Sequence, residues 1–112
     1  MGEDKAPLIR GTLTPLILKS LSWGSLHGYA IAAWIQQRTD AVLQVEEGVL
    51  YPALHKLERD GFLKSHWGVN DTGRRAKFYA LTARGRKQLE AELALWRRTS
   101  EAVNAVLDAR EA

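Results

Sequence analysis

The sequence EEGVLYPALHKLERDGFLKSHWGVNDTGRRAKFYAL at residues 46–81 contains a change from a helical to a strand-like hydrophobic period. Its first half carries apolar side chains at positions i, i+4 and i+7, which share one face of a helix. These are Leu50, Leu54 and Leu57. Two acids suit the positive N-terminal end of such a helix, and Gly61 is a natural stop after it. The pattern therefore predicts an amphipathic helix over residues 46–60.

Two aromatic-rich segments follow that helix, residues 62–67 and 76–81, and both are typical of β-strands. Residues 68–75 between them contain Gly, Asn, Asp and Thr, which favour turns and do not easily continue a strand. The same segment ends in Arg74 and Arg75. The sequence thus predicts a β-hairpin with a polar, basic tip.

The flanking sequence completes a recognisable order of elements. Apolar spacing between residues 13 and 21 predicts a first helix, and a second is expected over residues 27–38. Downstream, Thr82 suits the cap of a long helix towards Arg110, although Gly85 in its first turn costs up to about 1 kcal/mol relative to alanine. Three helices followed by a hairpin indicate a winged helix-turn-helix, a mainly α fold whose third helix enters the DNA major groove.

The long C-terminal helix carries an apolar stripe at heptad a and d spacing, formed by Leu89, Leu93, Trp96, Val103 and Leu107. A helix of about 28 residues spans on the order of 42 Å, longer than a domain of this size can cover. Packing on the same protomer accounts for the first half of the stripe but hardly for Val103 and Leu107. We expect a twofold dimer, with recognition helices roughly 34 Å apart on a pseudo-palindromic site of double-stranded DNA.

Length and composition exclude several protein classes. The chain has 112 residues, of which 46% are hydrophobic and 26% charged, as in ordinary globular proteins. We divide it into a winged helix-turn-helix DNA-binding domain at 8–82 and a C-terminal dimerisation helix at 83–110. No apolar run approaches the roughly 20 residues of a membrane span, and residues 1–6 lack the apolar core of a signal peptide. Because there is no cysteine, we expect neither disulfides nor Cys-ligated metals. We also expect a cytoplasmic location.

Positive charge is concentrated in one segment rather than spread along the chain. The formal net charge is only +3, yet residues 56–87 hold nine Lys or Arg against three Asp or Glu. A cluster of this kind is the expected electrostatic footprint of a protein that binds a polyanion. A solvated basic surface without a partner is the alternative interpretation.

The face of the third helix opposite its leucines combines small residues with hydrogen-bond donors, which suits the major groove. The acids Glu46 and Glu47 argue slightly against DNA binding, because carboxylates near phosphates repel unless they cap the helix or accept a hydrogen bond from cytosine. An ordinary solvated face is the alternative, and His55 in particular either donates to a base edge or lies in solvent. The residues that we expect at the DNA are Gly48, Val49, Tyr51, His55, Lys56, Arg59, Lys64, Arg74, Arg75 and Lys77.

Three linked motifs resemble those of the PadR family of bacterial transcriptional regulators. They are His27-Gly28-Tyr29, Tyr51-Pro52-x-Leu54 and Tyr79-x-Leu81-Thr82-x-x-Gly85, in the family's order and spacing over roughly residues 8–98. Ala30 departs from the pattern, because the family often carries an acid there. The resemblance implies a homodimeric repressor that binds a palindromic operator and is released by a small effector. It also implies that Tyr51 touches the DNA backbone.

A single helix after the hairpin resembles the compact subgroup of the family, in which the last helix dimerises with help from the first. The expected dimer interface is therefore Leu13, Ile17, Leu89, Leu93, Trp96, Val103 and Leu107. Compact members bind planar drugs between the dimer helices, so the resemblance makes Trp96 the candidate for a planar small-molecule effector. Structural packing is an equally good explanation of a tryptophan at a heptad position.

No arrangement of residues points to catalysis, a cofactor or a metal. His27, His55 and His66 lack ligand-like spacing, and Ser25 with His27 lacks a third group to orient a base. No glycine-rich phosphate-binding motif occurs in the chain. We therefore expect a DNA-binding transcriptional regulator and not an enzyme. The alternative is a winged-helix module that binds an acidic protein through its basic segment and never touches DNA.

Overall fold

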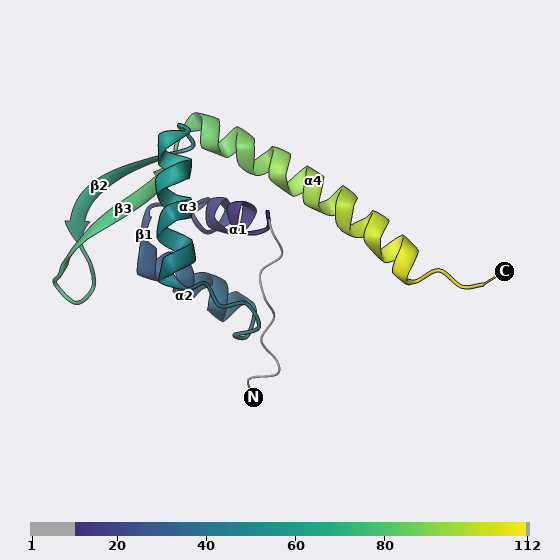
Figure 1. The fold of residues 1–112 in the computed structure, drawn as a ribbon. Helices are drawn as coiled ribbons and strands as arrows, with labels where there is room; N and C mark the ends of the chain where they lie inside the picture. The colour runs from purple at the N-terminus through teal and green to yellow at the C-terminus, as the bar shows by residue number, and fades with distance from the viewer. Residues whose placement is uncertain (1–10, 112) are drawn as a thin grey trace.

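The fold consists of four α-helices and three β-strands, seen in a computed structural model that describes residues 11–111 (Figure 1). The elements are α1 (Leu13–Ser20), β1 (Leu26–His27), α2 (Gly28–Arg38), α3 (Glu47–Arg59), β2 (Leu63–Val69), β3 (Arg75–Leu81) and α4 (Ala83–Leu107). The predicted order of three short helices, a hairpin and a long helix is confirmed, with one short strand added. The predicted domain start at residue 8 lies outside the described residues.

The core lies between the first three helices and the sheet. The leucines of α3 that the helical period predicted are all buried in it. They belong to one cluster with Ile17 and Leu18 of α1, Ile31 and Ile35 of α2, and Tyr79 of β3, among others. Burial of apolar surface contributes about 25 cal/mol per Å². This packing fixes the rotation of α3 about its axis and leaves the opposite face of the helix in solvent.

The sheet is antiparallel with the strand order β1-β3-β2. β1 consists of Leu26 and His27, which pair with Tyr79 and Phe78 of β3. The sequence did not predict this strand, because two residues are too few to show the alternation that identifies a strand. β1 matters for the site below, since it joins the start of α2 to the hairpin.

The hairpin strands extend further towards the tip than their sequence pattern predicted, and Val69 pairs with Arg75. The turn is tight because the Asn70 side-chain oxygen accepts hydrogen bonds from the backbone N–H groups of Thr72, at 3.1 Å, and Arg74, at 2.9 Å. Asparagine commonly organises turns in this way. The expected turn over residues 68–75 therefore shortens, and its first two residues continue β2.

The junction between β3 and α4 is built on Thr82. As predicted, its hydroxyl caps α4 by accepting from the Gly85 N–H at 3.0 Å, and it also donates to the Gly61 carbonyl at 2.7 Å. Gly85 is not the defect that helix propensity suggested. It is buried, and a Cβ at this position would overlap the Phe62 carbonyl oxygen. Glycine is therefore needed for the close approach of α4 to the turn before β2.

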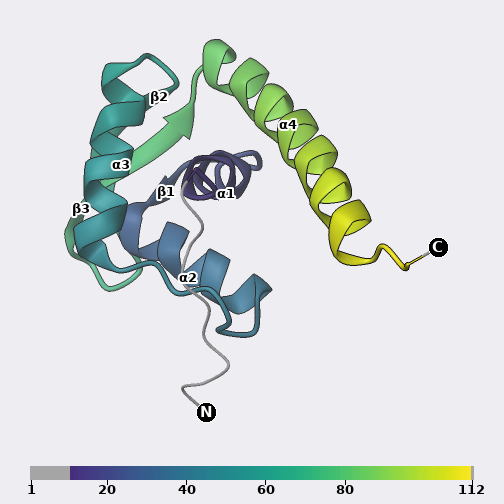
Figure 2. The same ribbon diagram turned by 45° about the vertical axis from the view of Figure 1, so that its right-hand side comes forward.

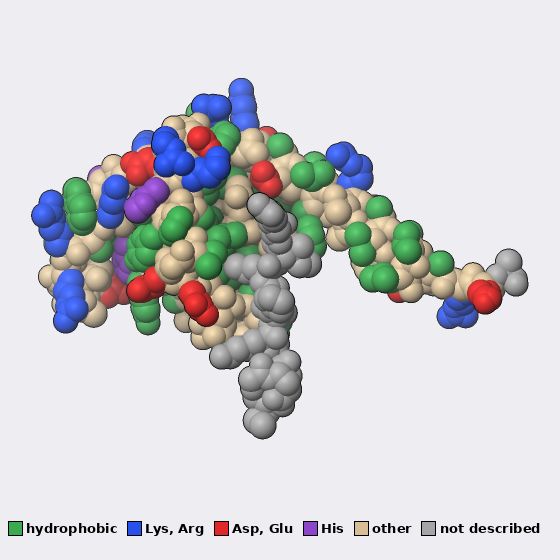
Figure 3. Space-filling model, in the orientation of Figure 1, with side chains coloured by type: hydrophobic (Ala, Val, Ile, Leu, Met, Phe, Trp, Pro, Cys, Tyr) green, Lys and Arg blue, Asp and Glu red, His purple; other side chains and the backbone are tan. Residues whose placement is uncertain are grey.

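The second half of α4 projects beyond the winged domain (Figures 1 and 2). Hydrophobic side chains lie along this projecting half (Figure 3). They include Val103 and Leu107, which belong to the predicted apolar stripe. Leu95 and Val106 are also exposed there, although the sequence analysis did not include them. Apolar residues exposed in a row of this kind are rare on a monomer and typical of an interface.

Candidate nucleic-acid interface

The outer face of α3 is exposed along its length. Gly48, Val49, His55, Lys56 and Arg59 all lie in solvent, opposite the buried leucines. The sequence pattern thus placed these side chains on the correct face. The N-terminal end of this face carries the small residues Gly48 and Val49, and hydrogen-bond donors follow further along the helix. A helix needs both features to read base edges in the major groove.

Tyr51 does not share that open face but lies half-buried against the start of α2. A Cβ on Gly28 would be 2.8 Å from the Tyr51 ring, so the ring would have to move if this glycine were replaced. His27 precedes Gly28 and caps α2, because its Nδ1 accepts from the Ala30 N–H at 3.3 Å. The packing orients Tyr51 along the boundary between α2 and α3.

The hairpin has two faces, and the predicted cations divide between them. Leu63 of β2 and Leu81 of β3 are opposite each other and buried. Because side chains alternate along a strand, every second residue from these two leucines lies on the side of the hairpin that faces α3. Arg75 and Lys77 belong to this side. Lys64 belongs to the other side and does not join the surface that contains α3. Arg74 lies in the turn at the tip.

The hairpin and α3 are held together by Glu58. Its carboxylate accepts from the Ser65 hydroxyl and lies 3.5 Å from Lys77 Nζ. The Ser65 hydrogen bond and then the Lys77 charge lower the pKa of Glu58 below its usual range. Burial, and to a smaller extent the charge of the same carboxylate, raises the pKa of Tyr79. The positive charge of Lys77 is therefore partly neutralised by Glu58 of the same protomer.

Lys56 also has a partner within the protomer. Its Nζ lies 2.8 Å from an Asp60 carboxylate oxygen, one helical turn away, and this hydrogen bond lowers the pKa of Asp60. The Lys56 side chain is two-thirds exposed, at 67%. Exposed pairs of this kind contribute little to stability, so Lys56 can exchange Asp60 for a phosphate at small cost.

A cleft of about 410 Å³ runs between α3, the start of α2 and the hairpin. Aromatic, imidazole and cationic side chains line it, and they include Tyr29, Tyr51, His55, Trp67, Arg75 and Lys77. The Arg75 guanidinium lies 4.4 Å from the centre of the Trp67 ring. Sequence reasoning missed Tyr29 and Trp67, because their sites depend on β1 and on the hairpin register. Alternation along β2 from Ser65 to Trp67 was the available signal.

Two of the predicted interface residues are already covered within one protomer. Ile17 is 0% exposed and Leu89 is 8% exposed, and both belong to the core. They have almost no surface to offer a partner, so the expectation for these two positions is corrected. Leu13 and Leu93 pack on the rim of the core. Trp96, Val103 and Leu107 are the predicted positions that stay open, at 46%, 50% and 73% exposed.

Among the described residues, no group of three or more His, Asp or Glu side chains is arranged to hold a metal ion. None of the described helices is long and apolar enough to cross a membrane. The arrangement is instead one exposed helix and one cationic hairpin beside a shared cleft, which suits a polyanionic double helix.

Comparisons with known proteins agree with this geometry. Residues 17–91 match the transcriptional regulator PadR-like family. The chain is 39% identical to the transcriptional regulator Rv3488 of Mycobacterium tuberculosis, over 65% of this chain and 64% of that protein. It is 30% identical to the negative transcriptional regulator PadR of Bacillus subtilis, over 65% of this chain and 40% of that protein.

Solved structures show the same fold. A transcriptional regulator from Clostridium thermocellum superposes with a TM-score of 0.78 at 33% identity, over 86% of this chain and 93% of that one. The family match covers both α3 and the hairpin, the elements that form the cleft. The chain therefore belongs to the PadR-like family of transcriptional regulators, which are DNA-binding proteins and not enzymes.

Proposed function

We propose that the chain is a homodimeric repressor that binds a pseudo-palindromic operator and is released by a small effector. The observation that carries the proposal is the cleft between α3 and the hairpin, where Tyr51, His55 and Arg75 converge on one surface. α3 lies in the major groove, and the phosphate backbone passes through the cleft. The hairpin then reaches the adjacent minor groove.

The side chains divide by role along this surface. His55, Lys56 and Arg59 on the exposed face of α3 supply donors to base edges, and Gly48 and Val49 allow close approach. The residues that contact phosphates are Tyr29, Tyr51, Arg74 and Arg75. Lys77 adds positive charge beside Arg75, although it also forms an ion pair with Glu58. Lys64 faces away and adds only long-range attraction.

The dimer is proposed from the projecting half of α4. A second copy covers the exposed stripe through Trp96, Val103 and Leu107, and Leu95 and Val106 widen the contact. Leu13 and Leu93 lie at its edge. In this arrangement residues 8–82 form the DNA-binding domain and residues 83–110 the dimerisation helix. An effector stacked on Trp96 changes the tilt of the two winged domains and weakens binding to both half-sites.

Repression is proposed because the Bacillus subtilis relative is a negative transcriptional regulator by name. The sign of regulation is read from a reporter gene placed behind the selected operator, with and without expression of the protein. A drop in reporter output is expected. An increase would make the protein an activator.

Selection of bound sites from random duplex DNA tests DNA recognition directly. Two half-sites about one helical turn apart are expected. The double variant Arg74→Ala/Arg75→Ala is expected to bind more weakly, and its plot of log K against log salt flattens by about 0.9 for each lost phosphate contact. The matched control Arg97→Ala/Arg98→Ala removes the same charge from α4. Selection of no sequence at all would favour a module that binds an acidic protein.

The dimer is tested by light scattering during size-exclusion chromatography. Val103→Asp and Leu107→Asp place charges in the exposed stripe and are expected to give monomers of unchanged helicity. Glu90→Asp, which lies exposed on the same helix, is the control and remains dimeric. A wild-type protein that runs as a monomer at micromolar concentration contradicts this part of the proposal.

A further inference from the structure

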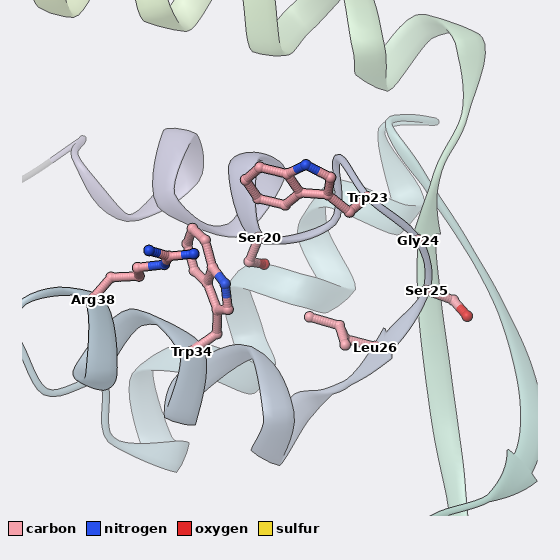
Figure 4. Close-up of a pocket in the computed structure, with 7 residues that line it drawn as sticks. All are labelled: Ser20, Trp23, Gly24, Ser25, Leu26, Trp34 and Arg38. Carbon is pink, nitrogen blue, oxygen red and sulfur yellow. The ribbon is translucent and has the colours of Figure 1, made fainter.

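A hollow of about 450 Å³ opens where the end of α1 meets α2, and none of its lining residues lines the DNA-facing cleft (Figure 4). Its walls are the indoles of Trp23 and Trp34, whose ring centres are 5.7 Å apart and tilted by 49°. Trp23 is 68% exposed, which is unusual for so large an apolar side chain. The volume falls within the range of small-molecule sites.

Arg38 lines the hollow, and the neighbouring Lys19 contacts the ring of Trp23, one of its walls. Lys19 Nζ lies 4.7 Å from the centre of the Trp23 ring, and the Arg38 guanidinium lies 5.5 Å from that of Trp34. Neither forms an ion pair with any residue that the structure describes. Each positive charge therefore rests on an aromatic face and remains available to an anion.

The remaining walls are apolar or already hydrogen-bonded. Leu26 lies across the hollow from Trp23, and Ser25 points away from it (Figure 4). Ser20 is buried and donates to the Ile17 carbonyl at 2.6 Å. The hollow thus offers flat aromatic surface and an apolar wall, with Arg38 as the one cation among its lining residues.

We propose that this hollow binds a planar aromatic carboxylate. The ring packs against Trp23 and Trp34, and the carboxylate lies beside the Arg38 guanidinium. Indole surface favours a flat ring, and a carboxylate matches the fork of a guanidinium. The site is separate from Trp96 and requires neither DNA nor a particular oligomeric state.

The test uses the four tryptophans of the chain, each of which gives one indole N–H resonance in a ¹H–¹⁵N spectrum. Titration of the full-length protein with 1-naphthoate is expected to shift the resonances of Trp23 and Trp34 and to leave those of Trp67 and Trp96 in place. The neutral 1-naphthamide is expected to cause much smaller shifts. Shifts confined to Trp96, or equal binding of the amide, would overturn the proposal.

Two variants assign the binding to these residues. Arg38→Gln is expected to weaken 1-naphthoate binding by about tenfold, as for loss of a hydrogen bond to a charged group. Arg98→Gln, an exposed arginine on α4, is the matched control and is expected to bind as the wild type does. Equal affinity of both variants would overturn the assignment.

Trp23→Ala separates a ligand site from a subunit contact. Because Trp23 lies mostly in solvent, this variant is expected to keep its fold and the oligomeric state of the wild type while losing naphthoate binding. A change in oligomeric state, measured by light scattering, would show that the two indoles serve contact between copies and would overturn the proposal.

Discussion

Tyr51 of α3 packs against Gly28 of α2 so tightly that a Cβ on Gly28 would lie 2.8 Å from its ring. The His27-Gly28-Tyr29 and Tyr51-Pro52-x-Leu54 motifs are thus two sides of one contact. This contact sets the angle between α2 and the exposed face of α3. It also holds the Tyr51 ring at the cleft beside the hairpin.

Gly28→Ala is expected to lower the free energy of unfolding by roughly 1–3 kcal/mol, as overpacking does, and to weaken DNA binding. Alanine is otherwise the better helix residue, so any loss in urea denaturation reports on the Tyr51 contact. In a Tyr51→Ala background the same change is expected to cost nothing further. An equal cost in both backgrounds would mean that Gly28 is needed for another reason.

Glu58 is expected to make stability depend on pH. Its pKa in the folded protein lies below the ordinary value of 4.5, so its stabilising contribution is complete above about pH 4.5 and is lost as the pH falls through the folded value. Glu58→Gln should therefore unfold at lower urea concentration than the wild type at pH 7, and the difference should shrink at pH 3. Glu90 is an exposed carboxylate on α4 that forms no ion pair with any described residue, so Glu90→Gln should show neither effect.

Trp67 is expected to act on DNA binding through Arg75. The Trp67 ring is 58% exposed and lies 4.4 Å from the Arg75 guanidinium, so it restricts where that charge can point. Loss of an exposed cation–π contact corresponds to roughly a two- to fivefold loss of affinity. Trp67→Leu should show this loss in a gel-shift titration with unchanged thermal unfolding.

The control for Trp67→Leu is Trp23→Leu, which removes another exposed tryptophan that does not line the cleft. It should bind DNA as the wild type does. In an Arg75→Ala background, Trp67→Leu should have little further effect. A full loss of affinity in that background would show that Trp67 contacts DNA on its own.

Two glycines in helices are expected to respond to alanine in opposite directions. Gly85→Ala forces a methyl group onto the Phe62 carbonyl oxygen and should cost roughly 1–3 kcal/mol or more of unfolding free energy. Gly48→Ala on the exposed face of α3 meets nothing within 4 Å and should gain up to about 1 kcal/mol from helix propensity. Urea denaturation of the two variants compares them directly. Stabilisation by Gly85→Ala would mean that α4 can move away from Phe62.

Features that depend on neighbours in the chain followed from the amino-acid sequence. The spacing of Leu50, Leu54 and Leu57 gave both the existence of α3 and the face that it buries, because helical periodicity determines which side chains meet the core. Thr82 marked the start of α4 correctly, because a cap bonds to backbone only three residues away. The three linked motifs identified the family for the same reason, since they are local in sequence.

Tertiary structure decided what depends on contacts between distant segments. It showed that β1 joins the sheet, that Gly28 receives Tyr51, and that Gly85 is required by Phe62. It also divided the hairpin cations between two faces through the register of β2 with β3. The apolar pattern marks a residue as buried without naming the surface that covers it. For that reason Ile17 could not be told apart from Leu107 until the chain was folded, when one proved to lie in the core and the other in solvent.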